Sequence, residues 1–287
     1  MSKTELHENP LVPNKKLRQM YIAMAEARVL DDYIVKLQRN AKGRSRVDST
    51  RGQEALRVST TIDLEPGDLV SDSQMGVVME LLLGEKVNSL LQRVPQLCSG
   101  KKVKETKMAG ASGQLLPWIE DAAERLRLAM GAALSFKTLG RRNVVIAYVC
   151  RDGLSKKDWP RLLSLASKLE LPLIFVVLPS VKSSGKKQAA NLSDDARRSG
   201  VPGIPVDAGD AVALYRVAQE SMGRIRGGDG PVLIECLQFA RKGEDGVSPV
   251  DPLLQLRRFL LRRRICKDVW LRSAGKNFRH RIEGARR

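Results

Sequence analysis

Two polar positions in the middle of the chain have the spacing of a ligand site. Asp152, followed by Gly153, comes after an apolar run, and Ser180 follows a second apolar run about 28 residues later. Residues that follow neighbouring parallel strands lie at the carboxyl ends of those strands, where open α/β sheets bind ligands. A carboxylate and a hydroxyl would then face one crevice, although the same Asp-Gly pair also suits an ordinary turn.

The segments around these positions predict a parallel sheet. Val144–Val149 and Leu173–Leu178 are rich in β-branched residues and flank about twenty residues with helical spacing, the pattern of a βαβ unit. A third buried strand is predicted at Val232–Leu237, and amphipathic helices at Lys15–Gln38 and, unbroken, at Leu116–Thr138. The alternation predicts an α/β fold with a mainly parallel, doubly wound sheet flanked by helices.

The composition narrows the classes of protein. Of 287 residues, 43% are hydrophobic, which is enough for one large α/β domain. No apolar run approaches the ~20 residues that span a bilayer, and the start of the chain lacks a secretory signal pattern. Four widely spaced cysteines indicate free thiols, so we expect a cytoplasmic protein without membrane contact. His7 and His280 alone nearly exclude a histidine-based catalytic centre.

Positive charge is concentrated at the C-terminus. The chain carries a net charge of +18, of which residues 257–287 contribute +10. We expect a loose arm at 1–14, one folded domain at 15–265 and a basic tail at 266–287, with a helix before the tail becomes loose. Such a tail suits nucleic acid or an acidic protein. The nucleic-acid alternative is weak, because only Trp270 and Phe278 lie among its charges.

Eight short motifs follow one another along the chain. They are Arg51–Ala55, Pro66–Asp68, Met130–Leu134, Arg151–Gly153, Leu171–Val177, Gly200–Gly203, Val206–Asp210 and Gly228–Glu235. In this order they resemble the alpha subunit of the decarboxylating component of 2-oxo acid dehydrogenase complexes, of the pyruvate and branched-chain type. The likeness runs from about Leu17 to Ile265, which is nearly the whole chain.

The resemblance implies the thiamine diphosphate-binding fold, with thiamine diphosphate and Mg²⁺ as cofactors, and oxidative decarboxylation of a 2-oxo acid. It also implies a beta-type partner subunit, since family active sites lie between alpha and beta subunits. The candidate cofactor-binding residues are Arg151, Asp152, Gly153 and Arg241. The candidate metal ligands are Asp152, Ser180 and the carbonyl of Lys182. No catalytic residue is assigned.

Several positions depart from the family pattern. Arg151 replaces the first glycine of the family's Gly-Asp-Gly, and Ser180 stands near its metal-binding Asn. The family's Tyr-Arg pair is missing from Ser71–Gly76, and its Gly-x-Val-Gly turn is replaced by Trp118–Arg127, which is predicted to be unbroken helix. Its Gly-His-Ser histidine is absent, with Glu244 near that place. We therefore expect weak binding of thiamine diphosphate, or none.

Three interpretations stay open. The chain is a working alpha subunit with unusual cofactor contacts, a degenerate paralogue that keeps the fold and the pairing surfaces, or a basic-tailed binding protein that contacts nucleic acid or an acidic partner. The loss of several cofactor contacts together favours the second. We also expect pairing with a beta-type subunit, or self-association, through Leu116–Thr138, where Ala129, Gly131, Ala132 and Ala133 would allow close approach; the alternative is that these small residues pack inside the protomer.

Overall fold

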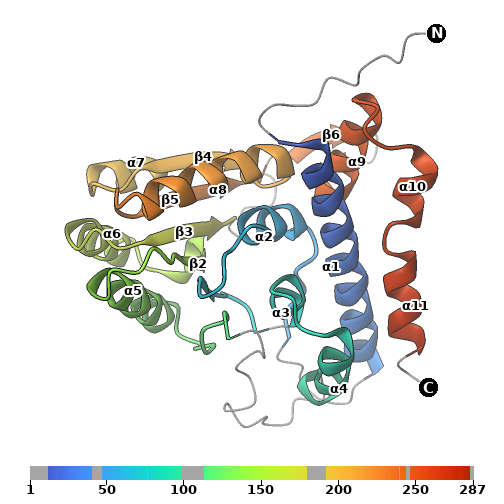
Figure 1. The fold of residues 1–287 in the computed structure, drawn as a ribbon, viewed down its shortest axis with the longest axis horizontal. Coiled ribbons are helices and arrows are strands. Elements are labelled where there is room, and N and C mark those ends of the chain that lie inside the picture. The colour runs from blue at the N-terminus through green and yellow to red at the C-terminus, as the bar shows by residue number, and fades with distance from the viewer. Residues whose placement is uncertain are drawn as a thin grey trace.

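The protein is built on one parallel sheet that lies between helices (Figure 1). The computed structural model describes residues 12–40, 47–75, 77–98, 113–179, 192–238, 240–243 and 246–284. The strands of this sheet are β1 (Leu69–Ser71), β2 (Val145–Cys150), β3 (Leu173–Leu178), β4 (Gly203–Asp207) and β5 (Val232–Leu237). Their order is β1-β2-β3-β5-β4, and every neighbouring pair is parallel. The predicted fold class and its three buried strands are confirmed.

Helices cover both faces of the sheet, because the strands are apolar on both. Ile174, Val176 and Leu178 of β3 join the core cluster that includes residues of α1 (Asn14–Asn40), α2 (Glu54–Thr61) and α8 (Ala211–Arg226). Leu173, Phe175 and Val177 point the other way, into a cluster with residues of α5 (Ala122–Thr138), α6 (Asp158–Lys168) and α7 (Leu192–Arg198). Strands buried on both faces are typical of parallel sheets between two helical layers.

Two of the short motifs fix the ends of strands. In Pro66–Asp68, Gly67 adopts φ +90°, and the buried Asp68 carboxylate accepts from Val144 N at 2.9 Å and from Arg226 Nη2 at 2.7 Å. Gly203 opens β4, and a Cβ there would lie 2.2 Å from the carbonyl oxygen of Ser193, so only glycine fits. These motifs therefore position the sheet.

The C-terminal segment is folded, which corrects the expected loose tail. After α9 (Pro252–Arg262), the chain forms α10 (Asp268–Ser273) and α11 (Lys276–Gly284), which lie beside α1 in Figure 1. Phe278 and Ile282 of α11 are buried in a third cluster with residues of α1, α3 (Val77–Leu82) and α4 (Val87–Cys98). The loose tail was predicted from the positive charge of this segment. The prediction was wrong because its few apolar residues are spaced along one face of a helix, and that face is buried.

Two further expectations are corrected. The arm at 1–14 is not loose at its end, since Val12 is fully buried and α1 begins at Asn14; residues 1–11 lie outside the described part. Residues 116–121 are not helical: Leu116 N donates to Val70 O at 2.8 Å, Leu115 bridges Val70, and α5 begins only at Ala122. The backbone of this segment extends the sheet edge at β1.

The chain also contains an antiparallel pair, β6 (Ala240–Gly243) and β7 (Gly246–Pro249), after β5. No helix in the described ranges has the length and apolar character needed to cross a membrane.

Candidate functional site

The carboxyl edge of the sheet brings together the end of β1, the end of β2 and the start of α5. A shallow pocket of about 620 Å³ opens there, lined by Ser73, Glu120, Asp121, Ala122, Arg125, Cys150 and Gly153. Its position outside the carboxyl ends of parallel strands is the one at which open α/β sheets bind ligands. Of the predicted site residues, Gly153 lines this pocket.

Arg151 is engaged by a buried carboxylate. The residue begins a short 3₁₀ turn after β2, and its guanidinium forms an ion pair with Glu235 of β5. The Glu235 side chain is only 1% exposed. Glu235 also accepts from Ser193 N at 2.8 Å and Leu192 N at 3.4 Å, at the start of α7. The side chain that replaces the family glycine is thus part of a buried polar network between β2, β5 and α7.

The remaining predicted ligands are placed only in part. Asp152 is exposed in the same 3₁₀ turn. Gly153 packs beneath α5, where an added Cβ would lie 3.3 Å from the Cβ of Ala122. Ser180 and Lys182 lie outside the described residues, and Arg241 lies in β6 with a side chain that is likewise outside them. Among the residues with a described structure, no group of three or more His, Cys, Asp or Glu side chains could hold a metal ion.

A fully buried arginine lies behind the pocket. Arg57 of α2 donates to Asp72 Oδ2 at 2.7 Å, to Gln74 Oε1 at 2.7 Å and to Gln53 Oε1 at 3.1 Å. Its guanidinium carbon also lies 5.2 Å from the ring centre of Tyr148. Burial would lower the pKa of Arg57, but the Asp72 carboxylate outweighs it and the pKa lies above its ordinary value. The segment after β1 lacks a cation of its own and pairs with one from α2.

Arg125 is the cation among the residues that line the pocket. The residue is 5% exposed, and its Nη1 donates to the carbonyl oxygens of Ile119 and Glu120. Burial lowers the pKa of the Arg125 guanidinium, an effect that nearby Asp72 partly offsets. Arg125 has no carboxylate within ion-pair distance among the residues the structure describes. It is the side chain in the pocket best suited to hold an anion.

Two carboxylates oppose that role. The N-terminus of α5 points at the pocket, but Asp121 caps it by accepting from Glu124 N at 2.7 Å. Glu120 and Asp121 both line the pocket. A capped helix end no longer offers free N–H groups to a phosphate, and two negative charges repel one. The pocket therefore combines one cation with an acidic rim.

The cysteine at the pocket has a raised pKa. Burial raises the pKa of the Cys150 thiol, while Ser73, Arg125 and Arg57 lower it in part. A thiol with a raised pKa is a weak nucleophile, because the thiolate is the reactive form. The raised pKa makes Cys150 a poor candidate for a catalytic nucleophile.

Arg57 and Arg125 were not predicted as site residues, although the sequence contains a signal for each. Asp121 and Glu124 have the spacing of a helix N-cap, which predicts that α5 starts at Ala122 and that Arg125 lies in its first turns. Arg57 lies in α2, whose residues are all buried, so its charge must be satisfied internally. No local signal identifies Glu235 as the partner of Arg151, because the two are 84 residues apart.

The described residues do not fit a diphosphate with Mg²⁺. Arg151 is paired with Glu235, the end of α5 is capped by a carboxylate, and Asp152 is the one predicted metal ligand whose side chain the structure describes. A diphosphate needs cations or metal close to it, and Mg²⁺ needs several oxygen ligands in octahedral geometry. Arg125 alone does not meet both requirements.

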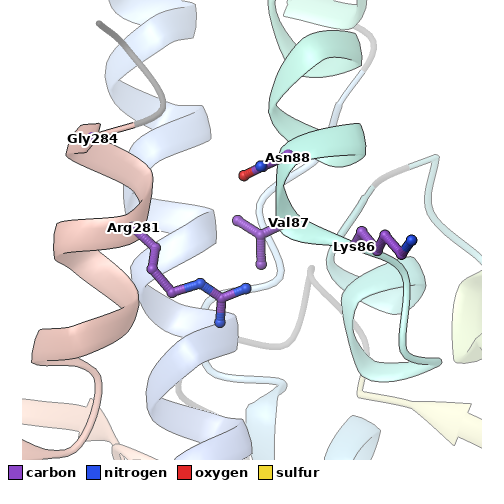
Figure 2. A pocket seen from close by; sticks show the side chains of 5 residues that line it. All are labelled: Lys86, Val87, Asn88, Arg281 and Gly284. Carbon is purple, nitrogen blue, oxygen red and sulfur yellow. The ribbon is translucent and has the colours of Figure 1, made fainter.

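A second pocket lies far from the sheet edge, between α4 and α11. It has a volume of about 540 Å³ and is lined by Lys86, Val87, Asn88, Arg281 and Gly284 (Figure 2). In this view Arg281 reaches toward Val87, while the Lys86 side chain points away from it. The two cations do not converge, so this pocket is not a built anion site.

Comparison with known proteins agrees with the fold. The chain matches the family model of the dehydrogenase E1 component over residues 21–246. It is 29% identical over 249 residues to the pyruvate dehydrogenase E1 component subunit alpha of Bacillus subtilis (strain 168), which covers 85% of this chain and 65% of the relative. The proteins of that name from Staphylococcus aureus (strain Mu50 / ATCC 700699) and Staphylococcus epidermidis (strain ATCC 35984) are 28% identical with the same coverage. The chain thus spans 65% of the length of these curated relatives.

Proposed function

Because this chain belongs to the dehydrogenase E1 component family, we propose that it is an alpha-subunit-like paralogue that keeps the family fold and is catalytically impaired or non-catalytic. The observation that carries the proposal is the ion pair between Arg151 and the buried Glu235. It lies at the position where the family pattern has a glycine beside the cofactor diphosphate. The reaction expected of the family is oxidative decarboxylation of a 2-oxo acid with thiamine diphosphate.

The energetics of this ion pair support the proposal. If Arg151 turned toward a diphosphate, Glu235 would remain 1% exposed with two backbone donors and no cation. An uncompensated buried charge is strongly unfavourable, so the pair resists opening. Thiamine diphosphate supplies the electron sink for decarboxylation, which side chains cannot replace. A chain that binds the cofactor poorly is therefore a poor decarboxylase.

A working alpha subunit is the second candidate function. Asp152-Gly153 is retained after β2, and Arg125 brings a cation to the adjacent pocket. A beta-type partner would then complete the site, in line with the expected pairing of alpha and beta subunits. Self-association is the alternative form of pairing. Contact with nucleic acid through the basic C-terminal helices is the weakest candidate, since in α9–α11 Phe278 is buried and Phe259 and Trp270 are only partly exposed for base stacking.

Titration calorimetry with thiamine diphosphate and Mg²⁺ tests the proposal on the full chain. We expect no binding or millimolar binding. Each lost charge-assisted contact costs roughly 1.5–3 kcal/mol, and losing two or three weakens binding by about three orders of magnitude. Asp152→Ala is the matched variant. Micromolar, Mg²⁺-dependent binding that this substitution abolishes would overturn the proposal and restore the working enzyme.

The titration is repeated with any partner that co-purifies with the chain. Weak binding by the isolated chain that becomes micromolar with the partner would support the second candidate function. Weak binding in both preparations supports the non-catalytic paralogue.

A further inference from the structure

Five exposed cations gather where α9 turns into α10. We name this surface the basic corner, and it consists of Arg258, Arg262, Arg263, Arg264 and Lys267. None of the five has a carboxylate within ion-pair distance among the described residues. By contrast, the neighbouring Arg257 and Arg272 both pair with Asp268. The fold thus neutralises two nearby cations and leaves the corner charged.

The backbone of the corner is strained at a charged residue. Arg264 adopts φ +55°, while its N–H donates to Leu261 O at 3.0 Å and Ile265 N–H donates to Leu260 O at 2.9 Å. This pattern ends many helices, and the left-handed residue in it is usually glycine. Arginine is less stable there because its Cβ crowds the backbone. Stability of the chain therefore does not explain a cation at this position.

Interaction with the dipole of α9 explains only part of the charge. Cations in the last turn of a helix are favourable, and this accounts for Arg262. The effect falls off beyond the last turn, whereas Arg264 and Lys267 lie after it. Three consecutive arginines also repel one another. The basic corner is positively charged although this costs backbone strain at Arg264 and repulsion between neighbouring arginines. Such a surface is a candidate for a binding function.

The corner is held rigidly. Arg18 Nη2 of α1 donates to Ile265 O at 2.9 Å, and Ile265 and Leu260 are buried in the main core cluster. Asp268 joins α9 to α10 through its two arginine partners. Cations on a fixed scaffold lose little conformational entropy on binding, which favours affinity for a partner of opposite charge.

We propose that the basic corner is a docking surface for an acidic protein segment. Four of its five cations are arginine, whose planar fork matches a carboxylate and which is enriched at protein interfaces. Val269, at the start of α10, is 80% exposed and supplies an apolar contact next to the charges in sequence. The aromatic residues nearby are already engaged: Trp270 packs 6.2 Å from Tyr21, Phe278 is buried, and the guanidinium carbon of Arg263 lies 5.9 Å from the ring centre of Phe259. These features favour a protein over single-stranded nucleic acid.

A fluorescence titration on the full chain tests the proposal with a labelled 20-residue peptide of Glu and Leu, at about 0.15 M salt. We expect micromolar binding that weakens at least tenfold in the Arg262→Ser, Arg263→Ser double variant. The matched control removes two exposed arginines elsewhere, through Arg127→Ser and Arg161→Ser on α5 and α6. We expect the control to bind within twofold of the parent chain.

The Arg264→Gly variant distinguishes a role of Arg264 in binding the peptide from a role in stabilising the fold. We expect this variant to raise the midpoint of thermal unfolding, since glycine relieves the strain, and to bind the peptide several times more weakly. A purely structural role for Arg264 would not weaken binding in a more stable protein.

The same titration with a 20-nucleotide single strand and a 20-base-pair duplex decides the class of partner. Tighter binding of either nucleic acid than of the peptide, lost in the double variant, would overturn the proposal in favour of a nucleic-acid surface. No peptide binding at this salt, or an equal loss in the control, would also overturn it. These outcomes are independent of the cofactor titration.

Discussion

Arg151 shows how one side chain changes the chemistry at the end of β2. In place of a glycine, the residue carries a guanidinium, and the structure turns it toward Glu235 of β5. The Glu235 carboxylate, which also accepts from two backbone N–H groups of α7, becomes the centre of a network that needs no cofactor. We infer that Arg151 now stabilises the apo fold.

Arg151→Gly restores the family residue and tests this inference. Because it leaves Glu235 buried without its cation, we expect the free energy of unfolding to fall by about 1.5–3 kcal/mol in urea titration. The low end is favoured, since the Arg151 side chain is 21% exposed. Lys137→Met is the control, because it breaks the exposed pair with Glu170 and should cost less than about 1 kcal/mol. An equal loss in both variants would contradict the inference.

Cys150 gives a pH-dependent prediction. Burial raises the pKa of its thiol above the ordinary value of about 8.5, so the thiolate fraction at pH 8 is smaller than in an unfolded chain. We expect slow alkylation of Cys150 by iodoacetamide at pH 8, with a rate that keeps rising above pH 9. Mass spectrometry of the peptides separates Cys150 from Cys98, Cys236 and Cys266. A rate that levels off below pH 8 would show a lowered pKa instead.

At the scale of elements, the start of α5 decides the shape of the pocket. Asp121 ends the extended segment and caps the helix, which places Arg125 and Ala122 at the ends of β1 and β2. An unbroken helix from Leu116 would have removed this pocket wall. The Asp121 cap, which the local sequence predicts, therefore shapes the pocket.

Asp121→Ala should destabilise the chain by about 0.5–2 kcal/mol, measured by thermal or urea unfolding, because the cap to Glu124 N is lost. Asp121→Asn is the control, since an amide oxygen can still accept that hydrogen bond, and it should cost less. If both variants lose the same stability, the charge of Asp121 matters more than its hydrogen bond.

The helix α11 gives the second prediction at this scale. Phe278 is 2% exposed against α1 and α4, so Phe278→Ala should cost about 3–5 kcal/mol and release α11 to trypsin. In the parent chain, α10 and α11 should resist brief digestion. Rapid trimming of the parent chain at Arg272 or Lys276 would show that these helices are only loosely held.

At the scale of the whole molecule, α5 has two faces with different roles. Ala129 and Ala133 are fully buried in the core of the protomer, so they are not available for pairing. Gly131 is exposed, with no atom within 4 Å of an added Cβ, and Leu134 is 40% exposed. Any pairing through this helix must use its outer face.

Gly131→Arg tests the outer face of α5. A large cation there should prevent association with a second copy or a partner subunit, and it should leave the unfolding midpoint of the protomer unchanged or slightly higher, because glycine is a poor helix residue. Light scattering at micromolar concentration reports the association state. Arg161→Glu, on the exposed face of α6, is the control for a surface charge change. A parent chain that is monomeric without any co-purifying partner would contradict pairing.

The sequence by itself determined the sheet and the family. Runs of apolar residues at β2, β3 and β5 define buried strands locally, and motifs such as Pro66–Asp68 and Gly200–Gly203 each fix a turn or a close backbone approach. The spacing of Phe278 and Ile282 in the sequence also specifies a buried face of α11, but the positive charge around these residues led to the expectation of a loose tail.

Only the tertiary structure decided the state of the candidate site. Arg151 meets Glu235 across 84 residues, and Arg57 meets Asp72 across 15, so neither pairing leaves a pattern in local sequence. Strand order brings β2 and β5 to either side of β3, and this places the guanidinium against the carboxylate. Whether an arginine can bind a ligand or is already paired within the protein depends on such contacts between residues far apart in sequence. The reason is that the strength of an ion pair depends on the distance between the two charges in space.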